Sequence, residues 1–327
     1  MSDFGWHVLD LDYAAAEQKI CGRLREITAR MLHRRGLIVA ISGGIDSSVC
    51  AALSVRALGK ERVFCLLLPE RDSSSRSGKL GQMLADHLGV ERLAVDIAPT
   101  LDAIGCYSWR DQAIRELFPE YRDNWKNKIV ISGGIERGIN IHKLVVESPD
   151  GKRQEKRIGA KQYLQIVAAQ NFKQRIRKTL EYFHADRLNY AVVGTPNRLE
   201  YDQGFFVKNG DGSADVKPIA HLYKTQVYAM AKFLGLPDRI TSATPTTDTY
   251  SLPQGQDEFY FALPHKEMDL ALWALNHGVA AAELAAVLKI TEQQANYIYE
   301  DIKTKRRTTR YLHHPPVLMS EIPELDL

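Results

Sequence analysis

Cysteine is scarce in this 327-residue chain, and long apolar runs are missing. The four cysteines, Cys21, Cys50, Cys65 and Cys106, include no C-x-x-C pair, which argues against a zinc site and a dithiol redox centre. Cys50 and Cys65 lie in apolar stretches, so we expect them to be small core residues. No run of about 18 apolar residues is present, and the sequence therefore predicts no membrane partner.

The amino terminus argues against a secreted protein, and the net charge argues against a nucleic-acid-binding protein. The opening MSDFGWHVLD lacks the basic segment and apolar stretch of a signal peptide, so we expect a cytoplasmic location. The formal net charge is only +3, which does not call for nucleic acid. Basic runs at 152–161 and 303–310 are interpreted as solvated surface, and binding of a phosphate-rich small ligand is the alternative.

Short apolar runs alternate with helical periodicity from residue 37 onward. The predicted strands cover 37–41, 63–68, 93–97 and 190–193. The predicted helices cover 46–58, 78–88, 172–183 and 222–234. Apolar strands with helices between them indicate a parallel sheet covered on both faces. The predicted fold class is α/β, a doubly wound five-stranded parallel sheet that binds ligands at the carboxyl ends of its strands.

Residues 99–165 interrupt this alternation. The turn Pro149-Asp150-Gly151 separates two β-compatible arms and predicts a hairpin, so we interpret the segment as an insertion on one domain spanning 1–327. A C-terminal helical segment is expected over about 265–312. Two of its helices, within 278–307, are expected to pack on the core rather than to read DNA as a helix-turn-helix.

The string ISGGI occurs twice, at 41–45 and at 131–135. In the first copy, Ser42, Gly43, Gly44, Asp46 and Ser47 stand where a predicted strand gives way to a helix. Glycines let backbone N–H groups approach a ligand, and a helix N-terminus favours an anion. Asp46 would repel phosphate unless Mg2+ lay between them. The string lacks the G-K-[ST] of a Walker A loop, so it predicts a phosphate site of another kind.

The second copy continues differently. It is followed by E-R-G, and Gly138 and Asn140 disfavour a helix, while INIHKLVVE has the pattern of a strand. We interpret this copy as a strand–turn–strand element of the insertion. The alternative is that Arg137 and the backbone of Gly133 and Gly134 contact an acid substrate.

The full S-G-G-x-D-S string resembles the PP-loop of the N-type ATP pyrophosphatases, which split ATP into AMP and pyrophosphate. Later motifs, in the same order, are similar to the NAD synthetase family in its ammonia-dependent form. They are N-x-x-x-R-x-R from Asn171, G-T-x-N-x-x-E from Gly194, F-x-K-x-G-D, P-I-x-x-L-x-K-T-Q-V, and P-T-x-D before P-x-G-Q-x-D-E. The resemblance covers roughly 200 residues and implies a ligase that activates a carboxylate by adenylation and then aminates it.

The resemblance also implies roles for individual residues. Asp46 and Glu200 would hold Mg2+, and Asp211 would lie by the ammonia. ATP would be contacted by Ser42, Gly43, Gly44, Ser47, Thr195, Lys224 and Thr246. The acid substrate, deamido-NAD, would be contacted by Asn171, Arg175, Lys208 and Asp215. The stretch 243–258 would form a lid over the site.

The resemblance leaves open the acid, the ammonia source and the assembly. No glutaminase-like segment precedes residue 37, so free ammonia or a separate glutaminase partner is expected. A homodimer is expected from the family. Two alternatives to NAD synthesis remain: amidation of another carboxylate by the same chemistry, and a non-catalytic nucleotide-binding regulator. The long segment 99–165 keeps the first alternative open, whereas the intact Asp46, Glu200 and Lys224 argue against the second.

Overall fold

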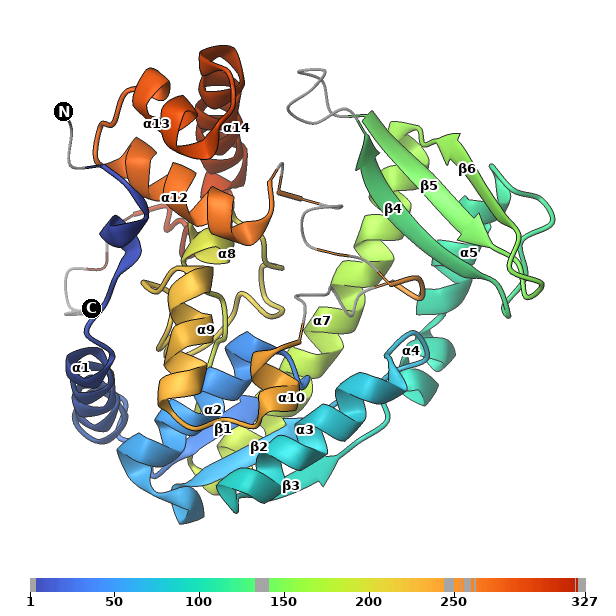
Figure 1. Ribbon diagram of the computed structural model, residues 1–327. Coiled ribbons are helices and arrows are strands. Elements are labelled where there is room, and N and C mark those ends of the chain that lie inside the picture. The colour runs from blue at the N-terminus through green and yellow to red at the C-terminus, as the bar shows by residue number, and fades with distance from the viewer. Residues whose placement is uncertain are drawn as a thin grey trace.

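A computed structural model contains a parallel sheet, which lies in the lower part of the view in Figure 1. The structure describes residues 4–132, 141–243, 250–253, 255, 260–261, 263–320 and 322. Four parallel strands follow the order β3-β2-β1-β7: β1 (Leu37–Ala40), β2 (Val63–Leu67), β3 (Glu91–Ala94) and β7 (Ala191–Val192). A parallel bridge between Val193 and Val216 occupies a fifth position beside β7. The predicted α/β fold class is confirmed.

Alternate residues of β1 reach opposite faces of this sheet. Leu37 and Val39 belong to one apolar cluster, together with residues of α1 (Tyr13–Glu26), α2 (Ile45–Leu58), α3 (Ser75–Leu88) and α9 (Lys224–Phe233). Ile38 belongs to the cluster on the other face, which includes residues of α4 (Ala98–Ile104), α5 (Cys106–Arg115) and α7 (Ala160–Leu188). The strand is buried on both sides, as its continuous apolar run predicts. All four cysteines are buried.

The long helix α7 differs most from its predicted bounds. It begins at Ala160, well before the predicted start at 172, and it runs for 29 residues. Good helix formers fill its first turns, and Ile166 and Ala169 are buried there. Two further helices, α4 from Ala98 and α5 from Cys106, fall in the first part of the segment 99–165, where no helix is predicted. The interpretation of that whole segment as an insertion ignored these helices, because their apolar residues are spaced among many polar ones.

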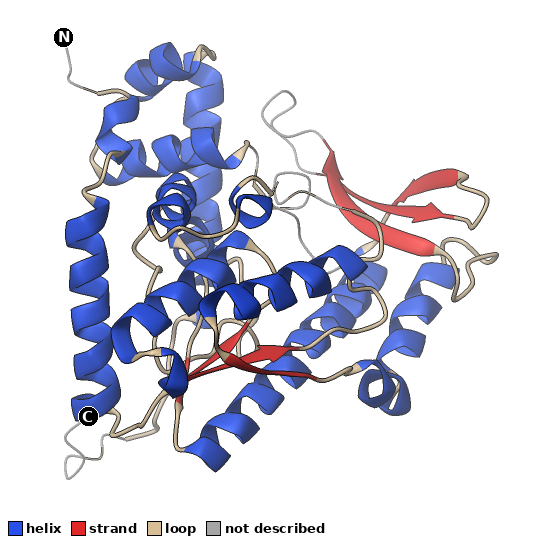
Figure 2. Cartoon of the chain, turned by 60° about the horizontal axis from the view of Figure 1, so that its bottom comes forward, coloured by secondary structure: helices blue, strands red, loops and turns tan. Residues whose placement is uncertain are grey.

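The inserted sheet is antiparallel and stands apart from the parallel one (Figure 2). Its strands are β4 (Lys126–Ser132), β5 (Ile141–Glu147) and β6 (Arg153–Arg157), in the order β4-β5-β6. The predicted hairpin joins β5 to β6, and Gly151 takes a positive φ of 84° in its turn. Ile131 and Ser132, the first two residues of the second ISGGI, are the last two residues of β4, and Ser132 pairs with Ile141 at the start of β5. Residues 133–140, which include Gly133, Gly134 and Arg137, lie outside the described residues.

The C-terminal helices pack on the core. Apolar side chains of α12 (His265–Asn276), α13 (Ala281–Leu288) and α14 (Glu292–Thr309) form one cluster that also includes Leu199 of α8 (Arg198–Gln203). The two helices predicted within 278–307 are confirmed as α13 and α14. The remaining short elements are η1 (Trp6–Leu9), η2 (Ile27–Met31), η3 (Lys60–Arg62), α10 (Asp238–Thr241) and η4 (Arg310–Leu312). In the described part of the chain, no helix has the length and apolarity needed to cross a bilayer.

Candidate active site

The first ISGGI forms a tight turn between β1 and α2. Gly43 has a φ of +78°, and a Cβ there would lie 2.6 Å from the Leu80 Cβ and 2.7 Å from the Ser77 carbonyl oxygen. Only glycine fits this turn. The Gly44 N–H donates to the Ser42 hydroxyl at 3.3 Å, and the Ser47 hydroxyl donates to the Gly44 carbonyl at 3.1 Å. The turn therefore presents two hydroxyls and the N-terminus of α2 to one place.

Three segments bring the predicted metal ligands together. Asp46, in the first turn of α2, forms an ion pair with Lys224, the first residue of α9. The Asn197 side-chain amide donates to Asp46 Oδ1 at 3.0 Å, and the Asn197 backbone N–H donates to Glu200 Oε2 at 3.2 Å. Asn197 is fully buried and is the N-cap of α8. A single residue thus links the two carboxylates, in a position fixed by a capping box.

Lys224 is a buried cation held by acidic neighbours. Burial by itself lowers the pKa of Lys224, but the charges of Asp46 and Glu200 outweigh burial and hold the pKa above its ordinary value. The first backbone N–H groups of α9 are capped from α12: Lys224 N donates to Asp269 Oδ1 at 3.1 Å and Thr225 N to Asp269 Oδ2 at 2.7 Å. Burial raises the pKa of Asp269 to about 7. The ammonium is therefore charged and fixed in place at neutral pH.

The donor set suits Mg2+ that is shared with phosphate. Asp46 and Glu200 supply two carboxylates, and Lys224 already places a cation beside them. Among the described residues, no group of three or more His, Cys, Asp or Glu side chains forms a complete protein cage for a metal. Magnesium is commonly held by one or two carboxylates, with phosphate oxygens and water completing its shell. The residues present fit that arrangement.

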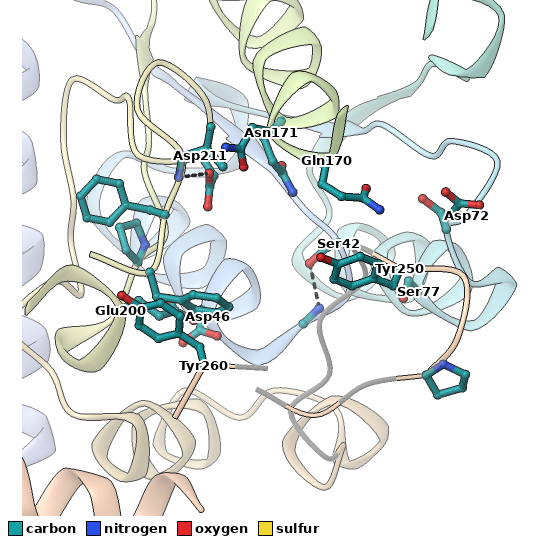
Figure 3. Close-up of a pocket in the computed structure, with 18 of the residues that line it drawn as sticks. Ser42, Asp46, Asp72, Ser77, Gln170, Asn171, Glu200, Asp211, Tyr250 and Tyr260 are labelled. Atoms are coloured by element: carbon teal, nitrogen blue, oxygen red, sulfur yellow. Dashed lines mark hydrogen bonds between the residues drawn. The ribbon is translucent and has the colours of Figure 1, made fainter. Parts of the chain in front are cut away.

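A cavity of about 1390 Å3 unites most of the predicted site residues (Figure 3). Those that line it are Ser42, Gly43, Gly44, Asp46, Ser47, Asn171, Thr195, Glu200, Asp211 and Lys224. Pockets for one drug-sized ligand have volumes of roughly 300–1,000 Å3. A cavity of this size leaves room for more than one substrate.

Three of the predicted site residues do not line this cavity. Arg175, Lys208 and Asp215 are not among the residues that line this cavity, and Thr246 lies outside the described residues. Arg175 Nε donates to the Lys208 carbonyl at 3.3 Å, and Lys208 Nζ donates to the Tyr311 carbonyl at 2.9 Å. Asp215 Oδ2 accepts from the Val192 N–H at 2.7 Å. Arg175 and Lys208 thus lie together near the C-terminal tail, and their contact with substrate stays a prediction.

Asp211 lines both the large cavity and a smaller one of about 270 Å3. Its Oδ1 accepts from the Val207 N–H at 2.8 Å, and burial raises its pKa. A buried ion pair of Lys178 and Glu181, 2.6 Å apart, lines the smaller cavity as well. An acid of this kind is suited to hold or accept a proton, which is compatible with the predicted place near ammonia.

Sequence reasoning missed a buried ion network behind the loop that follows β2. Lys173 Nζ lies 3.2 Å from Glu70 Oε1 and 2.5 Å from Asp72 Oδ2, and Arg110 forms a second ion pair with Asp72. The charges of Arg110 and Lys173 overcome burial and lower the pKa of Asp72. Asp72 lines the large cavity, so the network fixes one of its edges. No local pattern in the sequence joins residues so far apart.

The inserted sheet supplies another part of the cavity. Trp125, Lys126, His142 and Tyr163 line it from β4, β5, the preceding loop and the start of α7, and we call them the insert wall. The His142 and Tyr163 rings lie 4.7 Å apart. The segment 250–253, within the predicted lid, runs beside β4: the Asn127 N–H donates to the Ser251 hydroxyl at 2.8 Å, and the Leu252 N–H donates to the Asn127 carbonyl at 3.2 Å.

The fold and the first ISGGI define a nucleotide-binding α/β protein with a PP-loop. A family model described as NAD synthase matches residues 17–129 and 111–311. The chain is 54% identical over 324 residues to an NH(3)-dependent NAD(+) synthetase of Rhizobium meliloti, covering 99% of this chain and 97% of that protein. The chain belongs to the NAD synthase family.

Solved structures share the fold. An NH3-dependent NAD synthetase from Campylobacter jejuni aligns with a TM-score of 0.62 at 22% identity, covering 95% of this chain and 100% of that chain. An NMN synthetase from Francisella tularensis aligns with a TM-score of 0.64 at 20% identity, covering 94% of this chain and 99% of that chain. At such identities the likeness concerns the fold alone. The α/β architecture is thus common to these chains.

Proposed function

We propose that the chain synthesises NAD from deamido-NAD, ATP and ammonia, and releases AMP and pyrophosphate. One observation carries this proposal: the PP-loop hydroxyls line the same cavity as Asp46, Glu200 and Lys224. A regulator that only senses a nucleotide has no need for buried groups arranged around a leaving pyrophosphate. The membership in the NAD synthase family agrees with this chemistry.

The chain's own residues would act in two steps. In the first, an oxygen of the substrate carboxylate attacks the α-phosphorus of ATP, and pyrophosphate leaves. Ser42, Ser47 and the N-terminus of α2 would donate hydrogen bonds to the departing phosphates, and Lys224 would offset their charge. Asp46 and Glu200 would hold Mg2+, which lowers the repulsion between the phosphate oxygens and the attacking carboxylate.

In the second step, ammonia attacks the activated carbonyl carbon. AMP leaves, and the nitrogen loses a proton. Asp211, whose pKa is raised by burial, would accept that proton or orient the ammonia. Thr195 lines both cavities beside it and would contact a phosphate of the nucleotide. We place Asn171, Arg175, Lys208 and Asp215 on the acid substrate and Thr246 on ATP, as the family resemblance implies.

The assembly and location follow the same resemblance. We propose a cytoplasmic homodimer that takes free ammonia or receives it from a separate glutaminase. Segment 243–258 would serve as a lid over the site. Light scattering of the purified chain tests the dimer: a mass near twice the 36.9 kDa of the monomer is expected, and a monomeric mass contradicts it.

One assay tests the function. Purified protein with ATP, Mg2+, ammonium and deamido-NAD should form NAD and AMP in equal amounts, whereas glutamine in place of ammonium should not support turnover. Other nicotinate nucleotides, supplied in place of deamido-NAD, serve as competing acids. Release of AMP only with an acid other than deamido-NAD would overturn the assignment of the substrate and leave the chemistry intact. No acid-dependent AMP with any carboxylate would overturn the chemistry itself.

A further inference from the structure

Gln170 of α7 is a buried amide that faces the large cavity (Figure 3). The residue as a whole is 3% exposed. Neither Oε1 nor Nε2 of its amide has a hydrogen-bond partner within the part of the chain that the structure describes. A buried donor or acceptor without a partner is costly, and nearly all such groups in proteins are paired. An amide that keeps both groups unpaired at the surface of a cavity is suited to bind a ligand.

The helix holds this amide firmly. One turn further along α7, Lys173 is fixed by Glu70 and Asp72 in the buried ion network. One turn earlier, Ile166 belongs to the apolar cluster beneath the inserted sheet. The backbone of α7 is thus fixed on both sides of Gln170, which keeps this residue at the edge of the cavity.

The surroundings of Gln170 have the chemistry of a site for a nitrogen heterocycle. The insert wall brings the rings of Trp125, His142 and Tyr163 to the same cavity, and Tyr250 adds a fourth ring. Figure 3 shows Tyr250 and Asp72 on the same side of the cavity as Gln170, whereas Asp46 and Glu200 lie at the other side. Aromatic faces stack on planar bases, and each base stacked in this way contributes roughly 1–3 kcal/mol.

We propose that Gln170 binds the edge of an adenine base in the part of the cavity between α7 and the inserted sheet. A glutamine amide offers a donor and an acceptor side by side, which match the 6-amino group of adenine and the ring nitrogen next to it. The inference rests on the proposed function, because both of its nucleotides, ATP and deamido-NAD, carry adenine. The phosphates of ATP would remain at the PP-loop in either case.

The test replaces Gln170 by methionine, which has a similar shape and no amide. The KM of Gln170→Met for one of the two nucleotides should rise about tenfold, with kcat within about twofold, since one pair of hydrogen bonds is lost. A rise for ATP alone assigns the base of ATP, and a rise for deamido-NAD alone assigns the base of the dinucleotide. Unchanged KM values for both would overturn the proposal.

Base analogues make the assignment specific. Purine riboside triphosphate lacks the 6-amino group of ATP, and the purine analogue of deamido-NAD lacks it in the dinucleotide. The wild-type protein should bind the relevant analogue more weakly than the natural nucleotide, and Gln170→Met should bind the two equally. A variant that still prefers the 6-amino group would show that another residue reads the base.

A stability measurement separates this role from a structural one. Replacing an unpaired buried amide by an apolar group of similar shape should leave the melting temperature of the ligand-free protein unchanged or raise it. Gln203 is the matched control, because its amide is also buried and unpaired in the described structure but is not among the residues that line the cavity. Gln203→Met should leave the preference for the 6-amino group intact.

Equilibrium binding of ATP and of deamido-NAD, measured without turnover, keeps the two proposals apart. A wild-type protein that makes no NAD but binds a nucleotide in a Gln170-dependent manner would overturn the proposed function and support the base contact. If the wild-type protein makes NAD but Gln170→Met binds both nucleotides as tightly as the wild type, the proposed function is supported and the base contact is overturned.

Discussion

The cavity has a core wall and an insert wall, and the two differ in chemistry and in origin. The core wall consists of Ser42, Ser47, Asp46, Glu200 and Lys224, which lie on three segments at the carboxyl ends of the parallel strands. It is charged and rich in hydroxyls. The insert wall carries three rings and one lysine, on β4, β5, the loop before β4 and the start of α7, and these elements share a separate apolar cluster. The core wall suits phosphates, and the insert wall suits the flat parts of a nucleotide.

This difference separates chemistry from recognition. The groups of the core wall are tied to one another, because Asn197 bonds Asp46 and Glu200 while Asp46 holds Lys224. A change to one of them disturbs the others, since buried charges depend on their partners. The insert wall is joined by ring contacts and apolar packing, which tolerate substitution better. Changes in the core wall should therefore reduce kcat, whereas changes in the insert wall should raise KM.

The largest effect is expected at Asp46. Asp46→Asn removes a carboxylate from the predicted metal site and leaves Lys224 without its ion-pair partner. We expect AMP release with deamido-NAD and ammonium to fall by roughly 10³-fold, because charge on the phosphates is no longer offset. Asp102→Asn, an exposed acid on α4, is the control and should keep full activity. Retained activity in Asp46→Asn would refute the assignment of the first ISGGI as the ATP site.

A smaller loss is expected at Asn197, which acts through its neighbours. Asn197→Ala removes the bond to Asp46 Oδ1 and the N-cap of α8. We expect kcat to fall by about 10–100-fold, the range seen for residues that orient metal ligands. Asn197→Ser separates the two losses, because serine restores the cap but does not reach Asp46. We expect Asn197→Ser to recover stability but not kcat. Recovery of both would show that Asn197 acts only as a helix cap.

The core wall could be predicted from sequence, because its residues lie in short motifs whose turn and helix-capping requirements are visible in the motif itself. The S-G-G-x-D-S turn needs glycine at Gly43, and the N-x-x-E spacing of Asn197 and Glu200 is itself a helix-capping signal. That spacing was present in the quoted motif, yet no role was predicted for Asn197. The parallel sheet followed from continuous apolar runs for the same reason, since burial on both faces leaves a local pattern.

The insert wall could not be predicted, because its partners are distant in sequence. His142 meets Tyr163 only after the β5–β6 hairpin folds and α7 packs beside it, and Ser251 reaches Asn127 across 124 positions. The ion network of Asp72, Arg110 and Lys173 has the same character. Gln170 directly precedes the N-x-x-x-R-x-R motif that begins at Asn171. It stands out only because its buried amide lacks hydrogen-bond partners in the described part of the fold, and no sequence pattern reveals a missing partner.

A third prediction concerns the pH dependence of stability and rests on Asp269, which caps α9 behind Lys224 of the core wall. The pKa of Asp269 is about 7 in the folded chain and close to 3.8 when unfolded, so the folded state binds the extra proton between these values. Stability should therefore fall as the pH rises from about 4 to about 7, by roughly 1 kcal/mol per pH unit from this group. Urea unfolding at pH 5, 6 and 7 measures it. Asp269→Asn should show a shallower decline, and a decline as steep as in the wild type would contradict this.

The smallest effect is expected on the insert wall. Tyr163→Leu keeps apolar contact in the cavity but removes a ring that lies 4.7 Å from His142, so part of the stacking on a base is lost. We expect KM for one nucleotide substrate to rise about fivefold, since stacking contributes roughly 1–3 kcal/mol per base. Phe183→Leu, on the same helix but 59% exposed and outside the cavity, is the matched control and should change neither constant. A fall in kcat with KM unchanged would place Tyr163 in the chemistry and remove the functional difference between the two walls.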